Sequence, residues 1–186
     1  DIMMKRGASG GFDGEVLIAA TQSQGRGRMQ RSFFSPDGTG LYMSLLIRRP
    51  IPAQESVRMT AAAAVAVAQS IEVLSNRRTD IKWVNDIYMH DKKVCGILVE
   101  GRVSPDGLLQ HAVIGIGVNL APPPDGFPQD IATVAGAVFV SREQAVGMRE
   151  RLAAEILNRL AALLEDLQAP ALLEAYRSRS FLIGER

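Results

Sequence analysis

The segment from Gln54 to Ser75 constrains the fold more than any other part of the 186-residue chain. It is rich in alanine, which favours a helix, and its apolar residues occur on nearly every side. Such a helix is stable only when other elements cover it. We therefore predict a core helix with strands and further helices packed around it.

Short apolar runs on both sides of this helix predict the strands of one sheet. Before it, EVLIAA (15–20) predicts a buried strand, and LYMSLLIRR (41–49) predicts its hairpin partner, with a loop at the tip. After it, DIKWV (80–84), KVCGILVEGR (93–102) and HAVIGIGVNLA (111–121) predict three more strands. The turn SPDG joins the last two.

A second helix is predicted in the C-terminal part of the chain. Ser141 and Gln144 have the spacing of a capping box. Apolar residues then recur at helical spacing, namely Leu152, Ile156, Leu160, Leu163 and Leu167. The order of strands, helix, strands and helices lacks regular βαβ alternation. We therefore expect a single α+β domain, a mixed β-sheet with helices packed on it.

Composition narrows the classes of function. There are 21 Lys and Arg residues against 20 Asp and Glu, so the formal net charge of +1 gives no overall field for nucleic acid or an anionic membrane. The single cysteine, Cys95, excludes an internal disulfide framework, and we expect it to be a small core residue. No signal peptide is recognisable, so we expect a cytoplasmic location. The apolar run 61–68 is far shorter than the ~20 residues that span a bilayer.

The stretch GRGRMQRSF between the first two predicted strands has the residues of an anion-binding loop. Gly25 and Gly27 let the backbone approach a ligand closely. Arg26, Arg28 and Arg31 offer forked donors to carboxylate or phosphate oxygens. Taken alone, the stretch fits equally well a solvated hairpin tip or a patch that binds single-stranded nucleic acid.

Polar residues gather where the third predicted strand ends and the fourth begins. Lys82, Asn85 and Asp86 lie at the first of these ends, so we expect them on one rim of the sheet. Asp86 fits either a phosphate-bound magnesium ion or an Asx turn. Lys93 enters an apolar strand, where its charge needs an anionic partner, and is a candidate electrostatic catalyst. Lys92 is expected to extend to solvent at the edge.

Glycines in the last predicted strand indicate either the close approach of a ligand or a bulge. Gly115 and Gly117 stand in GIGVN, and the amide of Asn119 can contact an adenine edge or form a turn. His90 and His111 lack the spacing of metal ligands. We expect both to face solvent.

These four stretches, in this order, resemble the motifs of the biotin–protein ligase catalytic domain. TQSQGRGRMQRSF, KWVNDI, KKVCGILVE and GIGVN correspond to the family's GRGRxxRxW, KWPND, KxxGILVE and GxGxN. The resemblance covers nearly the whole chain and implies an α+β fold similar to the class II aminoacyl-tRNA synthetases. It also implies an ATP-dependent ligase that forms biotinoyl-AMP and then transfers biotin to a lysine of a biotin carboxyl carrier domain.

The resemblance further implies roles for individual residues. Lys93, Arg28 and Asp86 would be catalytic, with Asp86 holding magnesium, the one expected cofactor, through the phosphates. The residues implied in biotin binding are Gln22, Gly25, Arg26, Arg28, Lys93, Gly96, Leu98 and Gly115. Those implied in ATP binding are Arg28, Arg31, Phe33, Lys82, Asn85 and Asn119.

The chain also departs from the family pattern. Phe33 stands where the family has tryptophan, which leaves a smaller apolar wall on the adenine side. Val84 replaces the proline of KWPND and is expected to keep an extended backbone. The family's Ser-Thr-Asn segment and small C-terminal β-barrel are not found in residues 1–186, which we interpret as the catalytic domain without them.

Other functions stay open at this point. A lipoate or octanoate ligase would share the fold and activate a different acid, and a non-enzymatic biotin-sensing repressor fragment would bind biotin without transferring it. The near-neutral charge and 5% aromatic content argue against a single-stranded nucleic-acid binder. The expected partners are biotin, ATP and the carrier domain of a biotin-dependent carboxylase, without membrane or nucleic acid. A monomer and a homodimer both fit the sequence.

Overall fold

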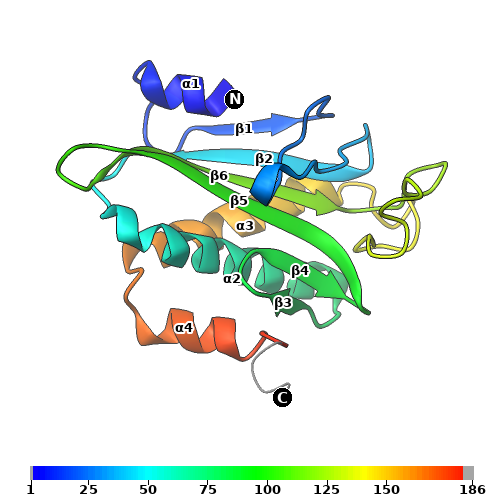
Figure 1. Cartoon of the computed structure of the whole chain (residues 1–186). Helices are drawn as coiled ribbons and strands as arrows, with labels where there is room; N and C mark the ends of the chain where they lie inside the picture. The colour runs from blue at the N-terminus through cyan, green and yellow to red at the C-terminus, as the bar shows by residue number, and fades with distance from the viewer. Residues whose placement is uncertain (1, 182–186) are drawn as a thin grey trace.

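The computed structural model describes residues 2–181 and contains one sheet with helices on both faces (Figure 1). Its elements in chain order are α1 (Ile2–Ala8), β1 (Val16–Ala19), β2 (Gly40–Ile47), α2 (Ser56–Ser75), β3 (Asp80–Lys82), β4 (Asp86–Met89), β5 (Lys92–Val103), β6 (Leu109–Asn119), α3 (Met148–Glu165) and α4 (Pro170–Arg177). Short 3₁₀ turns occur at Arg28–Gln30 and Ala53–Glu55.

The six strands lie in the order β1-β2-β6-β5-β4-β3, and every ladder between them is antiparallel. Two isolated parallel bridges, Ile81 with Ser180 and Lys93 with Ala135, join β3 and β5 to residues outside the strands. The predicted α+β class is confirmed. The strands β3, β5 and β6 and the hairpin β1–β2 match the sequence analysis. Strand β4 was not predicted, because its first residue, Asp86, was assigned to the polar end of the preceding strand.

Helix α2 is the predicted core helix. The run from Ala62 to Ala68 is completely buried, and α3 packs beside α2 on the same face of the sheet. The α3 residues Leu152, Ile156 and Leu160 join this core. Among the described residues, Ala53–Ser75 is the one helical segment whose length and composition would allow it to cross a membrane, and 61% of its apolar window is buried inside the protein. That burial is typical of a core helix.

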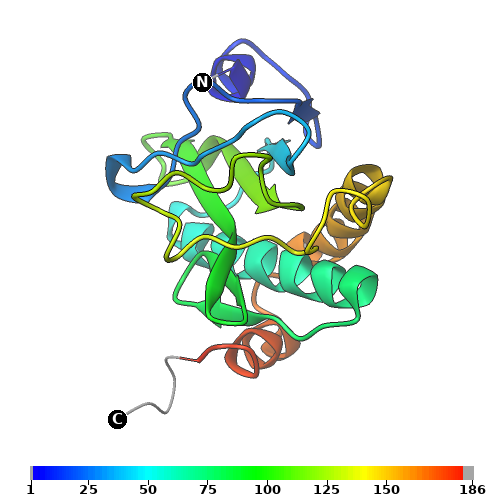
Figure 2. The same ribbon diagram turned by 90° about the vertical axis from the view of Figure 1, so that its right-hand side faces the viewer.

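The opposite face of the sheet, here called the loop face, carries the loop between β1 and β2. Side chains alternate along each strand, so Leu45 and Ile114 point to the α2 core while Leu46 and Val113 point to the loop face, where Met3 of α1 covers them. Figure 2 shows the loop (blue) on the side of the sheet away from α3. The loop face therefore has α1 at one end and the loop at the other.

Two local predictions were wrong. The β1 side chains Val16, Leu17 and Ile18 are 36–43% exposed, because β1 is an edge strand with a neighbour on one side only. The predicted capping box at Ser141 does not start α3, which begins at Met148 after Gly147 in a left-handed conformation (φ 68°). Helices α1 and α4, of seven and eight residues, were not predicted.

Candidate active site

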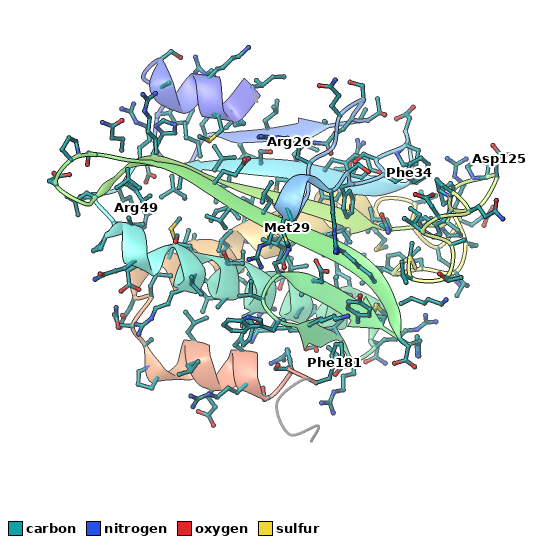
Figure 3. The ribbon with its side chains drawn as sticks, in the orientation of Figure 1. Arg26, Met29, Phe34, Arg49, Asp125 and Phe181 are labelled. Carbon is teal, nitrogen blue, oxygen red and sulfur yellow. The ribbon has the colours of Figure 1, made fainter. Side chains whose placement is uncertain are left out.

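The loop between β1 and β2 is folded back on itself. Gln22 forms an isolated antiparallel bridge with Ser35, and the Phe33 amide donates a 2.8 Å hydrogen bond to the Gly25 carbonyl. A Cβ at Gly25 would stand 2.3 Å from the Phe33 carbonyl oxygen, so this close approach requires glycine. The tip residue Met29 is 86% exposed, and Figure 3 shows it with Arg26 on this loop.

A pair of glycines forms the floor beneath the loop. Gly96 of β5 and Gly117 of β6 are direct cross-strand partners. The Phe33 ring lies over both, since a Cβ would come within 2.6 Å of the ring at Gly117 and 3.2 Å at Gly96. The Lys93 side chain reaches the same place, 3.4 Å from a Cβ built on Gly96. Phe33, predicted on the adenine side, thus lies over Gly96, which was assigned to the biotin slot.

The next pair along these strands, Leu98 and Gly115, leaves open space above the sheet. The two residues are cross-strand partners, and a Cβ at Gly115 would meet only the Leu98 carbonyl oxygen, at 3.5 Å. Gly117 was missing from the predicted biotin-binding residues, although it lies two residues from Gly115 and so on the same face. The two pairs, Gly96 with Gly117 and Leu98 with Gly115, are here called the slot.

Lys93 has the anionic partner that its position in the sequence required. Its Nζ lies 2.7 Å from Oδ1 of Asp86, and both side chains are mostly buried. The contact is ionic, because the two groups are not aligned for a hydrogen bond. Lys92 instead donates a 2.5 Å hydrogen bond to the Thr133 carbonyl, so it is tied to the 131–138 segment and lies away from Asp86.

Asn85, the residue before Asp86, contacts Arg28 of the loop. Its Nδ2 donates to the Ile97 carbonyl (2.8 Å), and its Oδ1 accepts a long 3.4 Å contact from Nη1 of Arg28. Val84 lies in the turn between β3 and β4, after a cis peptide bond to Trp83, and not in the extended strand end that was expected.

Two contacts that sequence reasoning did not predict hold the loop. Nη2 of Arg26 lies 2.6 Å from Oε2 of Glu100 on β5, and the Ser35 hydroxyl donates to Oε1 of Gln22 at 2.8 Å. Glu100 belongs to the KKVCGILVE stretch, so the sequence did contain a signal for it. The pairing with Arg26, 74 residues away, is a property of the fold.

Three predicted ATP-binding residues lie apart from this cluster. Asn119 donates from Nδ2 to the Gly136 carbonyl (2.9 Å). Lys82 is exposed, with its ammonium 5.6 Å from the centre of the Tyr88 ring, and Arg31 is exposed as well. Their described contacts are therefore with Gly136 and Tyr88 and not with the slot residues.

Two groups near the slot, Tyr88 and Cys95, have raised pKa values. Burial, and secondarily the Asp86 carboxylate, raises the pKa of Tyr88, so its phenol stays neutral. Burial raises the pKa of the Cys95 thiol strongly, which confirms that it is an inert core residue. Within residues 2–181, no group of three or more His, Cys, Asp or Glu side chains could hold a metal ion. Arg28 and Lys93 are the cations beside the slot.

Comparison with known proteins agrees with this geometry. A family model described as the biotin/lipoate A/B protein ligase family matches residues 12–119, more than half of the chain. The bifunctional ligase/repressor BirA of Bacillus subtilis is 42% identical over 135 residues, which cover 73% of this chain and 40% of that protein. The biotin–[acetyl-CoA-carboxylase] ligase of Mycobacterium tuberculosis is 30% identical over 191 residues, 99% of this chain and 68% of that protein.

The fold has the same relatives. The biotin protein ligase from Aquifex aeolicus, solved in complex with biotin and ATP, superposes with a TM-score of 0.76 at 24% identity, covering 98% of this chain and 75% of that one. The chain spans less than half the length of the Bacillus relative. The matching family model, the relatives and the shared fold lead to one conclusion: the chain belongs to the biotin/lipoate A/B protein ligase family.

Proposed function

We propose that residues 1–186 form the catalytic domain of a biotin–protein ligase. The observation that supports this function best is the slot of Gly96, Gly117, Leu98 and Gly115, which ends at Lys93. A fused, nearly planar ring system with an apolar chain fits such a floor, because three of its four residues are glycine. Its carboxylate would then lie at the cationic end.

The proposed reaction has two steps. An oxygen of the biotin carboxylate attacks the α-phosphorus of ATP, the bond to the β-phosphate bridge breaks, and pyrophosphate leaves. The amine of an acceptor lysine then attacks the acyl carbon of biotinoyl-AMP, AMP leaves, and the amine loses a proton. Both steps gather negative charge around the α-phosphate, which Lys93 and Arg28 would stabilise.

The contacts described above indicate what must rearrange for this chemistry. Phe33 covers the glycine floor, and Lys93 is engaged by Asp86. Biotin would displace the ring, and the anionic substrates would compete with Asp86 for the ammonium. Closure of the loop over the slot would also keep water from the mixed anhydride.

We propose that magnesium arrives with the nucleotide. Mg²⁺ is usually held by one or two carboxylates together with substrate phosphates. Asp86 Oδ1 is buried and faces a single ammonium, so this residue fits a shared ion better than a resident one. Asp86 would hold the ion, which would screen the phosphate charge.

Biotin-dependent exchange of labelled pyrophosphate into ATP tests the proposal without an acceptor protein. We expect exchange with biotin and none with lipoate, since the floor is built for a flat ring system. Equal exchange with lipoate would reassign the acid. A folded protein that exchanges with neither acid would contradict the ligase function.

The carrier domain of a biotin-dependent carboxylase is the proposed acceptor, in agreement with the name of the mycobacterial relative. A cytoplasmic location and the oligomeric state stay predictions.

A further inference from the structure

A cavity lies at the other end of the loop face. It is a half-open hollow of about 390 Å³ between α1, the end of β2 and the β5–β6 hairpin, and it is lined by Gly7, Ala8, Arg48, Arg102, Gln110 and His111. In Figure 3, Arg49 marks this end of the sheet, far from Arg26 and Met29. Gly117 follows His111 by six positions along β6, or about 20 Å. The cavity is therefore separate from the slot.

The cavity carries two positive charges and no carboxylate. Arg102 is the cross-strand partner of His111, and its guanidinium makes no hydrogen bond or ion pair with the described residues. Arg48 uses Nη1 to hold the Gly11 carbonyl at 2.7 Å.

The nearby acids are already paired with other arginines. Asp13 binds Arg49 at 2.8 Å while accepting the Arg48 backbone amide, and Glu15 binds Arg6 at 2.8 Å. Neither acid lines the cavity, so the described structure leaves its charge uncompensated.

The histidine between these arginines is largely buried, and its ring nitrogens are not among the atoms shut off from solvent. His111 is 3% exposed, which corrects the expectation that it faces solvent. Its imidazole makes no hydrogen bond with residues 2–181, although it lines the cavity. The ring lies against α1 so closely that a Cβ at Gly7 would stand 2.5 Å from its Cδ2. Since the ring also lines the cavity, its nitrogens can hydrogen-bond to a ligand there.

We propose that this cavity binds a phosphate monoester. A dianion balances the two guanidinium groups, and forked arginine donors match phosphate oxygens. His111 and Gln110 supply further polar contacts. The cavity volume lies within the ~300–1,000 Å³ range of small-molecule sites, so it has room for the body of the ester as well as its phosphate.

Protonation of His111 and binding of the anion should favour each other. Burial and, after it, the charges of Arg48 and Arg102 lower the pKa of His111. Arg48, just after β2, and Arg102, on β5, are the charged groups that face the imidazole. Helix α1 presents only Gly7 and Ala8 at the cavity. A bound dianion would raise that pKa.

Histidine NMR tests the proposal with an internal reference, because the chain has two histidines and His90 is exposed on the β4–β5 turn. Glycerol 3-phosphate, inorganic phosphate and acetate are titrated separately at constant ionic strength. We expect a saturable shift of the His111 imidazole signals, with the monoester binding at least as tightly as inorganic phosphate and acetate much more weakly. The His90 signals should not follow it. Sulfate, which does not titrate near neutral pH, should bind more tightly as His111 becomes protonated.

Variants make the result decisive. Arg102→Gln should weaken glycerol 3-phosphate binding about tenfold or more, since it removes a charge-assisted contact. Arg77→Gln, an exposed arginine after α2, is the matched control and should change nothing. Equal binding of acetate, preference for inorganic phosphate over the ester, a non-saturating shift, or an unaffected Arg102→Gln would each overturn the proposal. Pyrophosphate exchange at the slot reports separately on the proposed ligase function.

Discussion

Lys93 lies 2.7 Å from Asp86, so any substrate that uses its ammonium must compete with that carboxylate. Replacing Lys93 by Gln should lower the rate of biotin-dependent pyrophosphate exchange by about 100-fold, because it removes charge stabilisation at the reacting oxygens. Exchange kinetics, with a thermal melt to verify folding, provide the measurement.

Lys92→Gln is the matched control for that substitution. Lys92 holds the Thr133 carbonyl and lies away from Asp86. It should retain most of the exchange activity. Similar losses in the two variants would mean that Lys93 has only a structural role.

His111 gives a pH dependence of stability whose sign follows from its surroundings. Burial and the neighbouring arginines lower its pKa in the folded protein below the ordinary value of 6.5, so the unfolded chain binds this proton more readily. The contribution is fully present above about pH 6.5 and is lost as the pH falls from there toward the lowered folded value. Urea unfolding across this window should show stability decreasing with acidity.

The two histidines separate this effect from general acid sensitivity. His111→Gln should flatten the slope near pH 6, and His90→Gln, at an exposed position, should leave it unchanged. A slope that survives in His111→Gln would assign the effect to other groups.

Some residue contacts were predictable and others were not. That Lys93 needs an anion follows from a charge placed at the start of an apolar strand. The contacts of Glu100 with Arg26 and of Phe33 with Gly117 depend on how distant segments pair, which no local pattern contains. His111 was misjudged because α1, which covers it, was not predicted.

At the scale of elements, the loop between β1 and β2 differs from the strands that support it. Arg28 lies on this loop and reaches Asn85 only through a 3.4 Å contact, whereas Lys93 stands on β5. Arg28→Gly should therefore impair retention of biotinoyl-AMP more than its formation, by roughly 10–150-fold for a charge-assisted contact of about 1.5–3 kcal/mol.

An added amine that traps released biotinoyl-AMP measures how much the variant loses, in comparison with the unmodified chain. Arg26→Gly is an informative comparison, because Arg26 is anchored at Glu100 and not at Asn85. If Arg28→Gly neither forms nor releases adenylate, Arg28 acts in the chemical step, and the loop is not a lid.

Long apolar elements were predictable because their burial needs many consecutive apolar residues. α2 and β6 are of this kind, with 20 and 11 residues. α1 and β4 are short, and their positions are set by contacts with Leu46, Val113 and β5. The start of α3 was predicted too early. Gly147, which follows the capping sequence, has a left-handed backbone conformation, and the helix begins only after it.

At the scale of the whole molecule, ligands should stabilise the fold by mass action. Biotin, ATP and magnesium together should raise the melting temperature more than biotin or ATP alone, because the product adenylate fills both halves of one site. At 100 times the dissociation constant the gain is about 2.7 kcal/mol, or roughly 5–10 °C for a chain of this size.

Differential scanning fluorimetry provides the measurement, with lipoate as the control acid. Equal stabilisation by lipoate and biotin would count against the biotin assignment. The absence of any shift in a protein shown to be folded would mean that residues 1–186 lack part of the site.

The pairing of β2 with β6 is an example of strand order, which sequence patterns do not predict. These strands pair over eight positions, although 61 residues lie between the end of β2 at Ile47 and the start of β6 at Leu109. The number of strands was nearly predictable from apolar runs. Their order depends on which pairings bury α2 completely.

The ring of Phe33 on Gly96 and Gly117 has a kinetic consequence. A ligand cannot settle on a floor that is already covered, so the ring must first leave, and that departure does not depend on ligand concentration. The observed rate of biotin association should therefore reach a plateau at high concentration instead of rising in proportion to it. The height of the plateau would be the opening rate of the resting protein, and Phe33→Ala should remove the plateau.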